Sequence, residues 1–227
     1  MNQGETMPIL DTVLFDNDGT LVDTYDLILE SFHHAVRNVL GHDIADEKLM
    51  AKVGQPLSTQ MWDFTDDSAV HEELLLTYRE FNHRIHDERV SLFPGVREGL
   101  ERLREEGFKM GVVTSKMSPL ARRGLEVLEV AEFFDCLVGA DSCPKHKPDP
   151  DPILMGCGLL GATPESCVYV GDSPYDLQAS NAAGTLSVAA LWGMFDEDVL
   201  CAENPCLACS DFSGLVDGIL ALREGCR

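Results

Sequence analysis

The stretch VLFDNDGTLVD, residues 13–23, runs from three consecutive apolar residues straight into a group of acids. Residues 13–15 are typical of a buried strand, whereas Asp16 and Asp18 would be costly to bury without partners. Ligands of open parallel sheets bind beyond the carboxyl ends of the strands. We therefore interpret this stretch as a strand that carries both carboxylates to a functional site at the edge of a sheet.

Short β-rich runs alternate with amphipathic segments through most of the chain, which is typical of a parallel sheet flanked by helices. Val96, Leu100 and Leu103 fall on one helical face before Gly107, and a second helix is expected from about Pro174 to Gly184. These patterns predict an α/β fold. Its predicted strands are DTVLFD (11–16), KMGVVT (109–114), CLVG (136–139), CVYVGD (167–172) and LSVAAL (186–191).

Residues 24–92 interrupt this alternation, because they contain helix after helix and no convincing strand. In one long segment Leu74, Tyr78, Phe81 and Ile85 recur at helical spacing. The exit, SLFPGV, contains a proline and a glycine and is interpreted as a hinge or linker. We therefore predict a core of residues 1–22 and 93–227 with an inserted all-helical cap domain, residues 23–92.

Polar residues follow four of the predicted strands, at ends that should meet at one edge of the sheet. They are Asp16, Thr114 with Ser115, Asp172, and the segment DSCPKHKPDPDP with Lys145 and Lys147. Three prolines stiffen the chain after Lys147, so we prefer Lys147 to Lys145 as the lysine of the site. In the same segment Asp151 is expected to cap a helix and Pro152 to occupy its first position.

Closely spaced carboxylates raise each other's pKa unless a cation lies between them. Mg²⁺, which prefers oxygen ligands, is the ion that we expect at Asp16 and Asp172. Phosphate esters are the substrates for which such an ion is most useful, because it neutralises their charge and polarises phosphorus. Asp176 has two interpretations, since its spacing from Ser173 is that of a capping box and it could also support the metal ligands from behind.

The net charge of −22, from 39 acidic and 17 basic residues, argues against a nucleic-acid partner or an anionic membrane surface. The same field repels small anions, so an anion site needs strong local positive charge. The start, MNQGETMPIL, lacks a basic segment before an apolar run, and no stretch is long enough to span a membrane, so we expect a cytoplasmic protein. The eight cysteines suit reduced thiols, and Cys201, Cys206 and Cys209 are interpreted as loop thiols rather than as a zinc or redox site.

With these pieces placed, the sequence resembles the haloacid dehalogenase superfamily, specifically its phosphatase branch with a small helical cap. Four motifs carry the resemblance in the family's order and spacing: DNDGT (16–20), the strand ending at Thr114, KPDP (147–150) and GDSPYD (171–176). The resemblance covers nearly the whole chain. It implies a Rossmann-like parallel sheet with helices on both faces and an inserted helical cap.

The resemblance also implies roles for the residues of these motifs. Asp16 would attack phosphorus to form an aspartyl-phosphate, and Asp18 would act as general acid and base. Asp16, Asp172 and the backbone carbonyl of Asp18 would hold the metal, while Thr114 and Lys147 would bind the phosphoryl oxygens. Dehalogenases lack the acid at the position of Asp18, because they have no phosphate leaving group to protonate.

Two features depart from the motifs or extend them. Asn17 occupies a slot that is usually apolar in the family, and alternation along the strand would point its side chain away from the site. The segment KVGQPL (52–57) resembles the specificity loop of the cap, so Lys52 or Gln55 could reach a substrate. A simple turn between helices is an equally good interpretation of this segment.

We therefore expect a Mg²⁺-dependent phosphatase that acts on a small phosphorylated metabolite, similar to phosphoglycolate phosphatase-like and pyrophosphatase-like members of the family. A phosphomutase of the β-phosphoglucomutase type is an alternative that needs the same residues, and a pyrophosphatase is another. A regulatory phosphate-binding module is the non-enzymatic alternative, against which the helical insertion and the acid at Asp18 argue. Monomer and homodimer are both compatible with the sequence.

Overall fold

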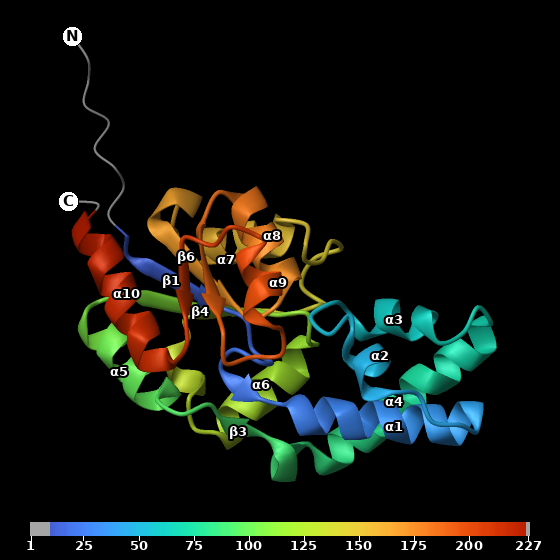
Figure 1. Cartoon of the computed structure of the whole chain (residues 1–227). Coiled ribbons are helices and arrows are strands. Elements are labelled where there is room, and N and C mark those ends of the chain that lie inside the picture. Colours follow the sequence, from blue (N-terminus) through green and yellow to red (C-terminus); the bar gives the residue numbers. More distant parts are fainter. Residues whose placement is uncertain (1–9, 226–227) are drawn as a thin grey trace.

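The computed structural model describes residues 10–225, in which six parallel strands form the main sheet in the order β5–β4–β1–β6–β7–β8 (Figure 1). The predicted α/β fold is confirmed, and the five predicted strands are all present, each within one residue of its predicted ends. In chain order these five are β1 (Thr12–Phe15), β4 (Lys109–Val113), β5 (Cys136–Val138), β6 (Cys167–Gly171) and β7 (Leu186–Ala190).

The sixth strand, β8 (Leu207–Cys209), was not predicted and lies at the edge of the sheet, where Leu207 pairs with Val188 of β7. The interpretation of the cysteine cluster as loop thiols is therefore wrong in two places, because Cys209 ends β8 and Cys201 ends the short helix α9 (Glu197–Cys201). An edge strand of three residues is too short to show a period of two. Among the described residues these thiols are free.

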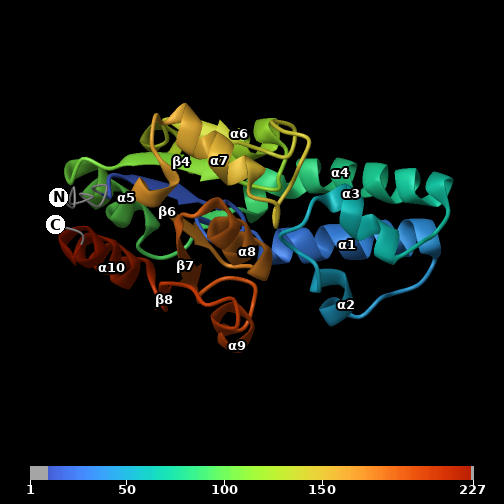
Figure 2. The same cartoon turned by 90° about the horizontal axis from the view of Figure 1, so that it is seen from above.

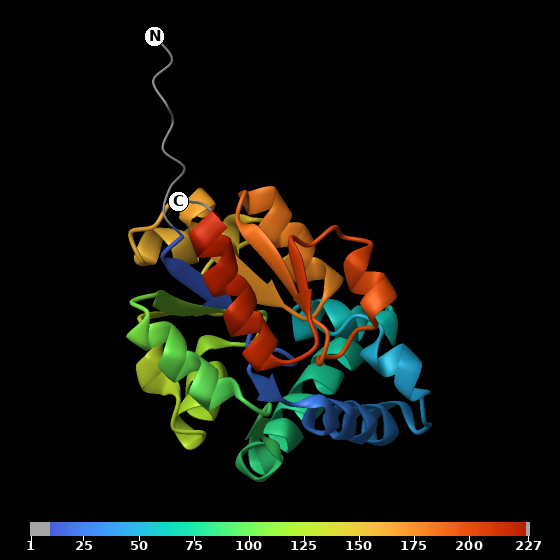
Figure 3. The same ribbon diagram turned by 60° about the vertical axis from the view of Figure 1, so that its left-hand side comes forward.

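Both faces of the sheet are covered by helices, because successive side chains of a strand point to opposite faces. Val13 and Phe15 belong to one apolar cluster, with α5 (Val96–Glu105), α6 (Ser118–Val127) and α10 (Phe212–Gly225). Leu14 belongs to another, with α7 (Asp151–Leu159) and α8 (Pro174–Ala183). Figure 3 shows α10 (red) crossing in front of the sheet beside α5 (green).

The helix ends agree with the sequence in one case and differ in another. Gly184, with a φ of 79°, terminates α8 as predicted. The N-cap of α7 is Pro150 rather than Asp151, so the predicted start is one residue late. Because the helix begins one residue earlier, the backbone amide of Asp151 lies in its first turn and has no partner within the helix. This amide donates to the Asp149 side chain at 3.3 Å.

Residues 23–92, which we call the helical insertion, contain α1 (Tyr25–Leu40), α2 (Asp46–Met50), α3 (Leu57–Gln60) and α4 (Ser68–Arg89). They pack on an apolar cluster of their own that includes Phe32, Leu49 and Leu74. In Figures 1 and 2, α1 and α4 run side by side and the insertion projects from the opposite end of the molecule from α10.

The two chain segments that join the insertion to the sheet pair with each other. β2 (Val22–Asp23) and β3 (Ser91–Leu92) form an antiparallel ribbon, with Val22 opposite Leu92. The exit predicted as a plain hinge or linker therefore begins as a strand. The two connecting segments lie side by side, so the backbone N–H and C=O groups of one can form hydrogen bonds with those of the other.

The described part of the chain contains no helix long and apolar enough to cross a lipid bilayer. Residues 1–9, which form most of the stretch from which a cytoplasmic location is predicted, lie outside the described residues.

Candidate active site

The order of the strands brings the predicted polar residues to one edge of the sheet. β1 lies between β4 and β6, with Phe15 opposite Val112 on one side and Val170 on the other. Asp16, Thr114 and Asp172 follow these three strands directly and are all buried. The rule that parallel strands present their carboxyl ends together is sufficient to explain this arrangement.

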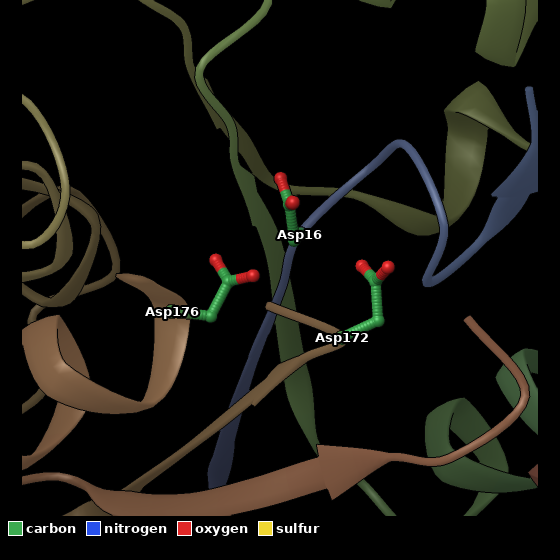
Figure 4. A group of neighbouring side chains, drawn as sticks. All are labelled: Asp16, Asp172 and Asp176. Atoms are coloured by element: carbon green, nitrogen blue, oxygen red, sulfur yellow. The ribbon is translucent and has the colours of Figure 1, made fainter. Parts of the chain in front are cut away.

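Asp16, Asp172 and Asp176 form a compact group of carboxylates (Figure 4). One oxygen from each lies within 4.8 Å of the others, and all three side chains are buried. In residues 10–225 this is the only group of three or more His, Cys, Asp or Glu side chains with such spacing. Asp176 enters the group from the first turn of α8, whereas the other two come from strand ends.

Lys147 provides the positive charge of this group. Its Nζ lies 3.1 Å from Oδ1 of Asp16, contacts Oδ1 of Asp176, and donates to the hydroxyl of Tyr169 at 2.9 Å. Although burial opposes its charge, the carboxylates of Asp16 and Asp176 raise the pKa of Lys147 above its ordinary value, so it is a cation. The structure thus brings Lys147 to the acids, whereas the exposed Lys145 pairs with Asp149 and Asp151.

Asp176 caps helix α8, as the first of its two interpretations predicted, and it also contacts Lys147. Ser173 and Asp176 form a complete capping box at the start of α8, in which Oδ2 of Asp176 accepts from the backbone amide of Ser173 at 3.0 Å. Its other oxygen, Oδ1, faces Lys147. Because one oxygen of Asp176 serves the helix cap and the other contacts the Lys147 ammonium, Asp176 orients Lys147 beside Asp16.

Asp172 is fixed by groups that the sequence did not single out. Thr20 Oγ1 donates to Oδ1 of Asp172 at 2.9 Å, and the backbone amide of Met194 donates to Oδ2 at 2.8 Å. A Cβ at Gly19 or at Gly193 would lie 2.1 or 2.2 Å from atoms of this side chain, so only glycine fits at either position. The carboxylate is therefore held in one orientation from three sides.

The buried carboxylates carry more negative charge than Lys147 can balance. Three acids face one lysine, which leaves a formal excess of two negative charges. Burial raises the pKa of Asp16 to about 7 in spite of Lys147, and it raises the pKa of Asp172, with repulsion from Asp176 and Asp16 adding to the effect. An all-oxygen donor set with this excess fits a hard divalent cation held by Asp16 and Asp172.

Asp18 has a partner that was missed. Lys116 Nζ donates to Oδ1 of Asp18 at 2.7 Å, and both side chains are largely buried. Lys116 follows Thr114 and Ser115 immediately after β4, so the strand-end rule that selected those two residues also applies to it. Asn17, between the two acids, is buried and does not line the pocket above the carboxylates.

This pocket, of about 370 Å³, lies between the sheet edge and the helical insertion. Asp16, Asp18, Thr114, Ser115, Asp172 and Ser173 line it from the core, and Gln55, Tyr78, Arg79, Asn82 and His83 are among the residues that line it from the insertion. The hydroxyl of Ser115 is buried and has no hydrogen-bond partner among the described residues. Such a hydroxyl is free to bind a substrate oxygen.

The segment 52–57 approaches the core closely at Gly54, which lies beside Ser173 and Tyr175. A Cβ at Gly54, whose φ is 102°, would lie 2.8 Å from Ser173 Oγ. Gln55 lines the pocket, whereas Lys52 does not, because its Nζ pairs with Asp63 at 2.6 Å on the surface of the insertion. The structure therefore brings Gln55 and not Lys52 to the site, and it does not support the expectation that Lys52 reaches a substrate.

The sequence is similar to several curated bacterial proteins. A protein of Caldanaerobacter subterraneus described as a candidate pyrophosphatase, PpaX, is 43% identical over 193 residues, which cover 85% of this chain and 87% of that protein. The pyrophosphatase PpaX of Bacillus cereus strain AH820 is 37% identical over 196 residues, which cover 86% of this chain and 90% of that protein.

Solved structures and a family model agree with this similarity. A crystal structure of a predicted phosphoglycolate phosphatase from Haemophilus somnus has a TM-score of 0.86 at 24% identity and covers 93% of this chain and 98% of that chain. A predicted phosphatase from Clostridium acetobutylicum has a TM-score of 0.85 at 24% identity, with coverage of 94% and 100%. At these identities the structures establish the fold alone. The model of the haloacid dehalogenase-like hydrolases matches residues 13–190, and the chain belongs to this family of hydrolases, as its four motifs predicted.

Proposed function

We propose that this protein is a Mg²⁺-dependent phosphatase that hydrolyses a small phosphorylated metabolite through an aspartyl-phosphate at Asp16. The observation that carries the proposal is the pairing of Asp16 with the buried Lys147, at 3.1 Å, at a pocket that Asp16 and Asp18 line. A nucleophilic carboxylate, a fixed cation and a second carboxylate are the groups that phosphoryl transfer through an enzyme-bound intermediate requires. Family membership and the names of the relatives support the same class of reaction.

In the first step, a carboxylate oxygen of Asp16 attacks phosphorus and the bond from phosphorus to the leaving oxygen breaks. Asp18 gives its proton to that oxygen, so the leaving group departs as an alcohol or acid. Lys147, Thr114 and the free hydroxyl of Ser115 hold the phosphoryl oxygens during transfer. Mg²⁺ held by Asp16, Asp172 and the carbonyl of Asp18 would supply neutralisation of the phosphoryl charge.

In the second step, Asp18 takes a proton from water as the water oxygen attacks phosphorus. The bond between phosphorus and the Asp16 oxygen then breaks, which releases inorganic phosphate, restores the Asp16 carboxylate and leaves Asp18 protonated for the next cycle. Lys116 pairs with Asp18 at 2.7 Å and holds the Asp18 carboxylate in place for this second step, in which it accepts the proton. The helical insertion acts as a cap in this proposal, because it supplies one wall of the pocket and limits the entry of bulk water.

Pyrophosphate is a second candidate substrate, favoured by the names of the relatives described as PpaX pyrophosphatases. The same residues would serve, with phosphate instead of an alcohol as the leaving group. A panel of phosphate monoesters and pyrophosphate, scored by kcat/KM, separates the two candidates.

The test of the proposed function is phosphate release by the wild type and by Asp16→Asn. We expect release that requires Mg²⁺, is stopped by EDTA, and is lost in Asp16→Asn. Asp11→Asn is the matched control, because Asp11 immediately precedes β1 at the strand end opposite the site and its side chain is half-exposed. Activity that survives Asp16→Asn would overturn the assignment of the nucleophile, and tight phosphate binding without turnover of any compound would favour a regulatory module.

A further inference from the structure

Basic side chains gather on one wall of the pocket. Arg79 and His83 lie one turn apart on α4, and Lys116 follows β4. Asp16, Asp18 and Asp172 line the same pocket from the edge of the sheet, and we call this part its floor. In a chain with 39 acidic and 17 basic residues, three basic groups lining one pocket are a local exception to the overall charge.

Of the three arginines of α4, only Arg89 has an acidic partner among the described residues, and only Arg79 lines the pocket. The residues three and four positions away are Leu75, Leu76, Asn82 and His83, so an ion pair within the helix is not available. Among residues 10–225 no carboxylate oxygen lies within 4.0 Å of its guanidinium. By contrast, Arg89 pairs with Glu30 at 3.2 Å, and Arg84 lies over the ring of Phe81.

The neighbours of Arg79 make the same region positive. Burial lowers the pKa of His83, and the charges of Arg123, Arg79 and Lys116 lower it further. Lys116 is engaged with Asp18 and Arg123 with Asp87, both by ion pairs. Arg79 is therefore the cation of this group whose charge is left for a ligand.

We propose that Arg79, with His83 beside it, binds a second anionic group of the substrate, and that the enzyme selects phosphate compounds whose leaving group is itself negatively charged. The inference rests on the proposed function, in which Lys147 and Thr114 hold the reacting phosphoryl group on the floor. A guanidinium presents paired donors that match the two oxygens of a carboxylate or phosphate. A pocket of about 370 Å³ has room for a small compound that reaches from the floor to this wall.

A matched pair of substrates tests the selection. Phosphoglycolate and 2-hydroxyethyl phosphate differ only in a carboxylate against a hydroxymethyl group, and pyrophosphate offers a phosphate in that place. In Arg79→Gln the ratio of kcat/KM for phosphoglycolate to that for 2-hydroxyethyl phosphate should fall by about tenfold or more, because one hydrogen-bonded charge is lost. If kcat/KM for pyrophosphate, relative to that for 2-hydroxyethyl phosphate, falls as well, Arg79 is a general anion site. If the relative kcat/KM falls for only one of phosphoglycolate and pyrophosphate, that compound carries the group that Arg79 binds.

The control is Arg84→Gln, which removes the same charge from the same helix but from a side chain that does not line the pocket. In Arg84→Gln the ratio of the two kcat/KM values should be the same as in the wild type. A ratio unchanged in Arg79→Gln, with both anionic compounds, would overturn the inference, as would an equal change in Arg84→Gln.

A binding measurement separates this inference from the proposed reaction. Calorimetry of phosphoglycolate and pyrophosphate with Asp16→Asn and with Asp16→Asn/Arg79→Gln requires no turnover. We expect affinity about tenfold weaker in the double variant for at least one of them. If the wild type turns over no compound of the panel, the proposed function fails while this comparison still decides the role of Arg79. Equal affinities of the two variants for both compounds would refute that role.

Discussion

Some side chains of this site could be predicted from the sequence, and others could not. Asp16, Asp172 and Lys147 could be predicted because acids and a lysine after apolar strands have no structural reason to be there. Tyr169 and Thr20 could not, because a tyrosine within β6 and a threonine in a turn are ordinary residues at ordinary positions. Their importance depends on contacts across 22 residues to Lys147 and 152 residues to Asp172.

Thr20→Val tests the support of Asp172 by a hydroxyl. The substitution keeps the shape of the buried side chain but removes the donor to Oδ1 of Asp172. We expect Mg²⁺ affinity, measured by calorimetry, to fall by about tenfold, since such supporting contacts are typically worth 10- to 100-fold in metal binding. The reason is that the carboxylate loses one of the contacts that orient it.

Thr20→Ser is the control for this prediction, because it keeps the hydroxyl and loses a methyl group. It should bind Mg²⁺ within a few-fold of the wild type. If the serine and valine variants lose affinity equally, packing of the Thr20 side chain supports Asp172 and its hydrogen bond does not.

Elements of the fold were predictable where they are long or strongly patterned. Four of the five predicted strands lie inside the sheet, where both faces need apolar residues, and β5 at one edge is apolar as well. β8, β2 and β3 have three, two and two residues, so pairing with a neighbour defines them and no local pattern does. The basic wall on α4 was also missed, because charges on a helix look alike whether they face solvent or a pocket.

The segment 52–57 offers a test of how the helical insertion meets the core. Alanine at Gly54 has an unfavourable φ of 102° and would bring a Cβ to 2.8 Å from Ser173 Oγ. We expect the segment to move away from Ser173, which misplaces Gln55 and lowers kcat/KM by about 10- to 100-fold. Steady-state kinetics measures this loss, and urea unfolding should give a cost of about 1–3 kcal/mol for the backbone strain.

Gly41→Ala is the matched control for Gly54→Ala. Gly41 ends α1 with a φ of 74°, and a Cβ there would have nothing within 4 Å. It should lower stability through strain of the same kind and leave kcat/KM as in the wild type. A similar kinetic loss in both variants would mean that general destabilisation, and not the contact with Ser173, explains the effect.

The whole molecule combines a strongly negative field with a site for anions. Its net charge of −22 disfavours the approach of any phosphate compound, so attraction has to be local. Lys147 supplies it beside Asp16 and Arg79 supplies it at the pocket wall, and a divalent cation would add to it at Asp16 and Asp172. The same cation would relieve the excess negative charge of the buried acids, which links metal binding to the stability of the fold.

This link predicts how stability depends on pH. The folded-state pKa of Asp16 is raised from 3.8 to about 7, so the metal-free folded protein holds a proton that the unfolded chain releases between these values. Stability in EDTA should therefore fall as pH rises from about 4 to about 7, by at most about 4 kcal/mol for this group. The raised pKa of Asp172 acts in the same direction. The lowered pKa values of Asp87 and Asp141 act below about pH 4, outside this window.

Histidines oppose this trend and have to be separated from it. Burial lowers the pKa values of His34, His83 and His86, so their contribution to stability rises with pH as pH approaches 6.5. The measurement is therefore the difference in the free energy of urea unfolding between the wild type and Asp16→Asn, in which these histidines are unchanged.

In EDTA the wild type should lose more stability than Asp16→Asn between pH 5 and about 7.5. Mg²⁺ should restore the wild type more than the variant at the higher pH, because it replaces the lost proton as the partner of the carboxylate. Equal responses of the two proteins to pH and to Mg²⁺ would show that Asp16 carries neither the proton nor the metal.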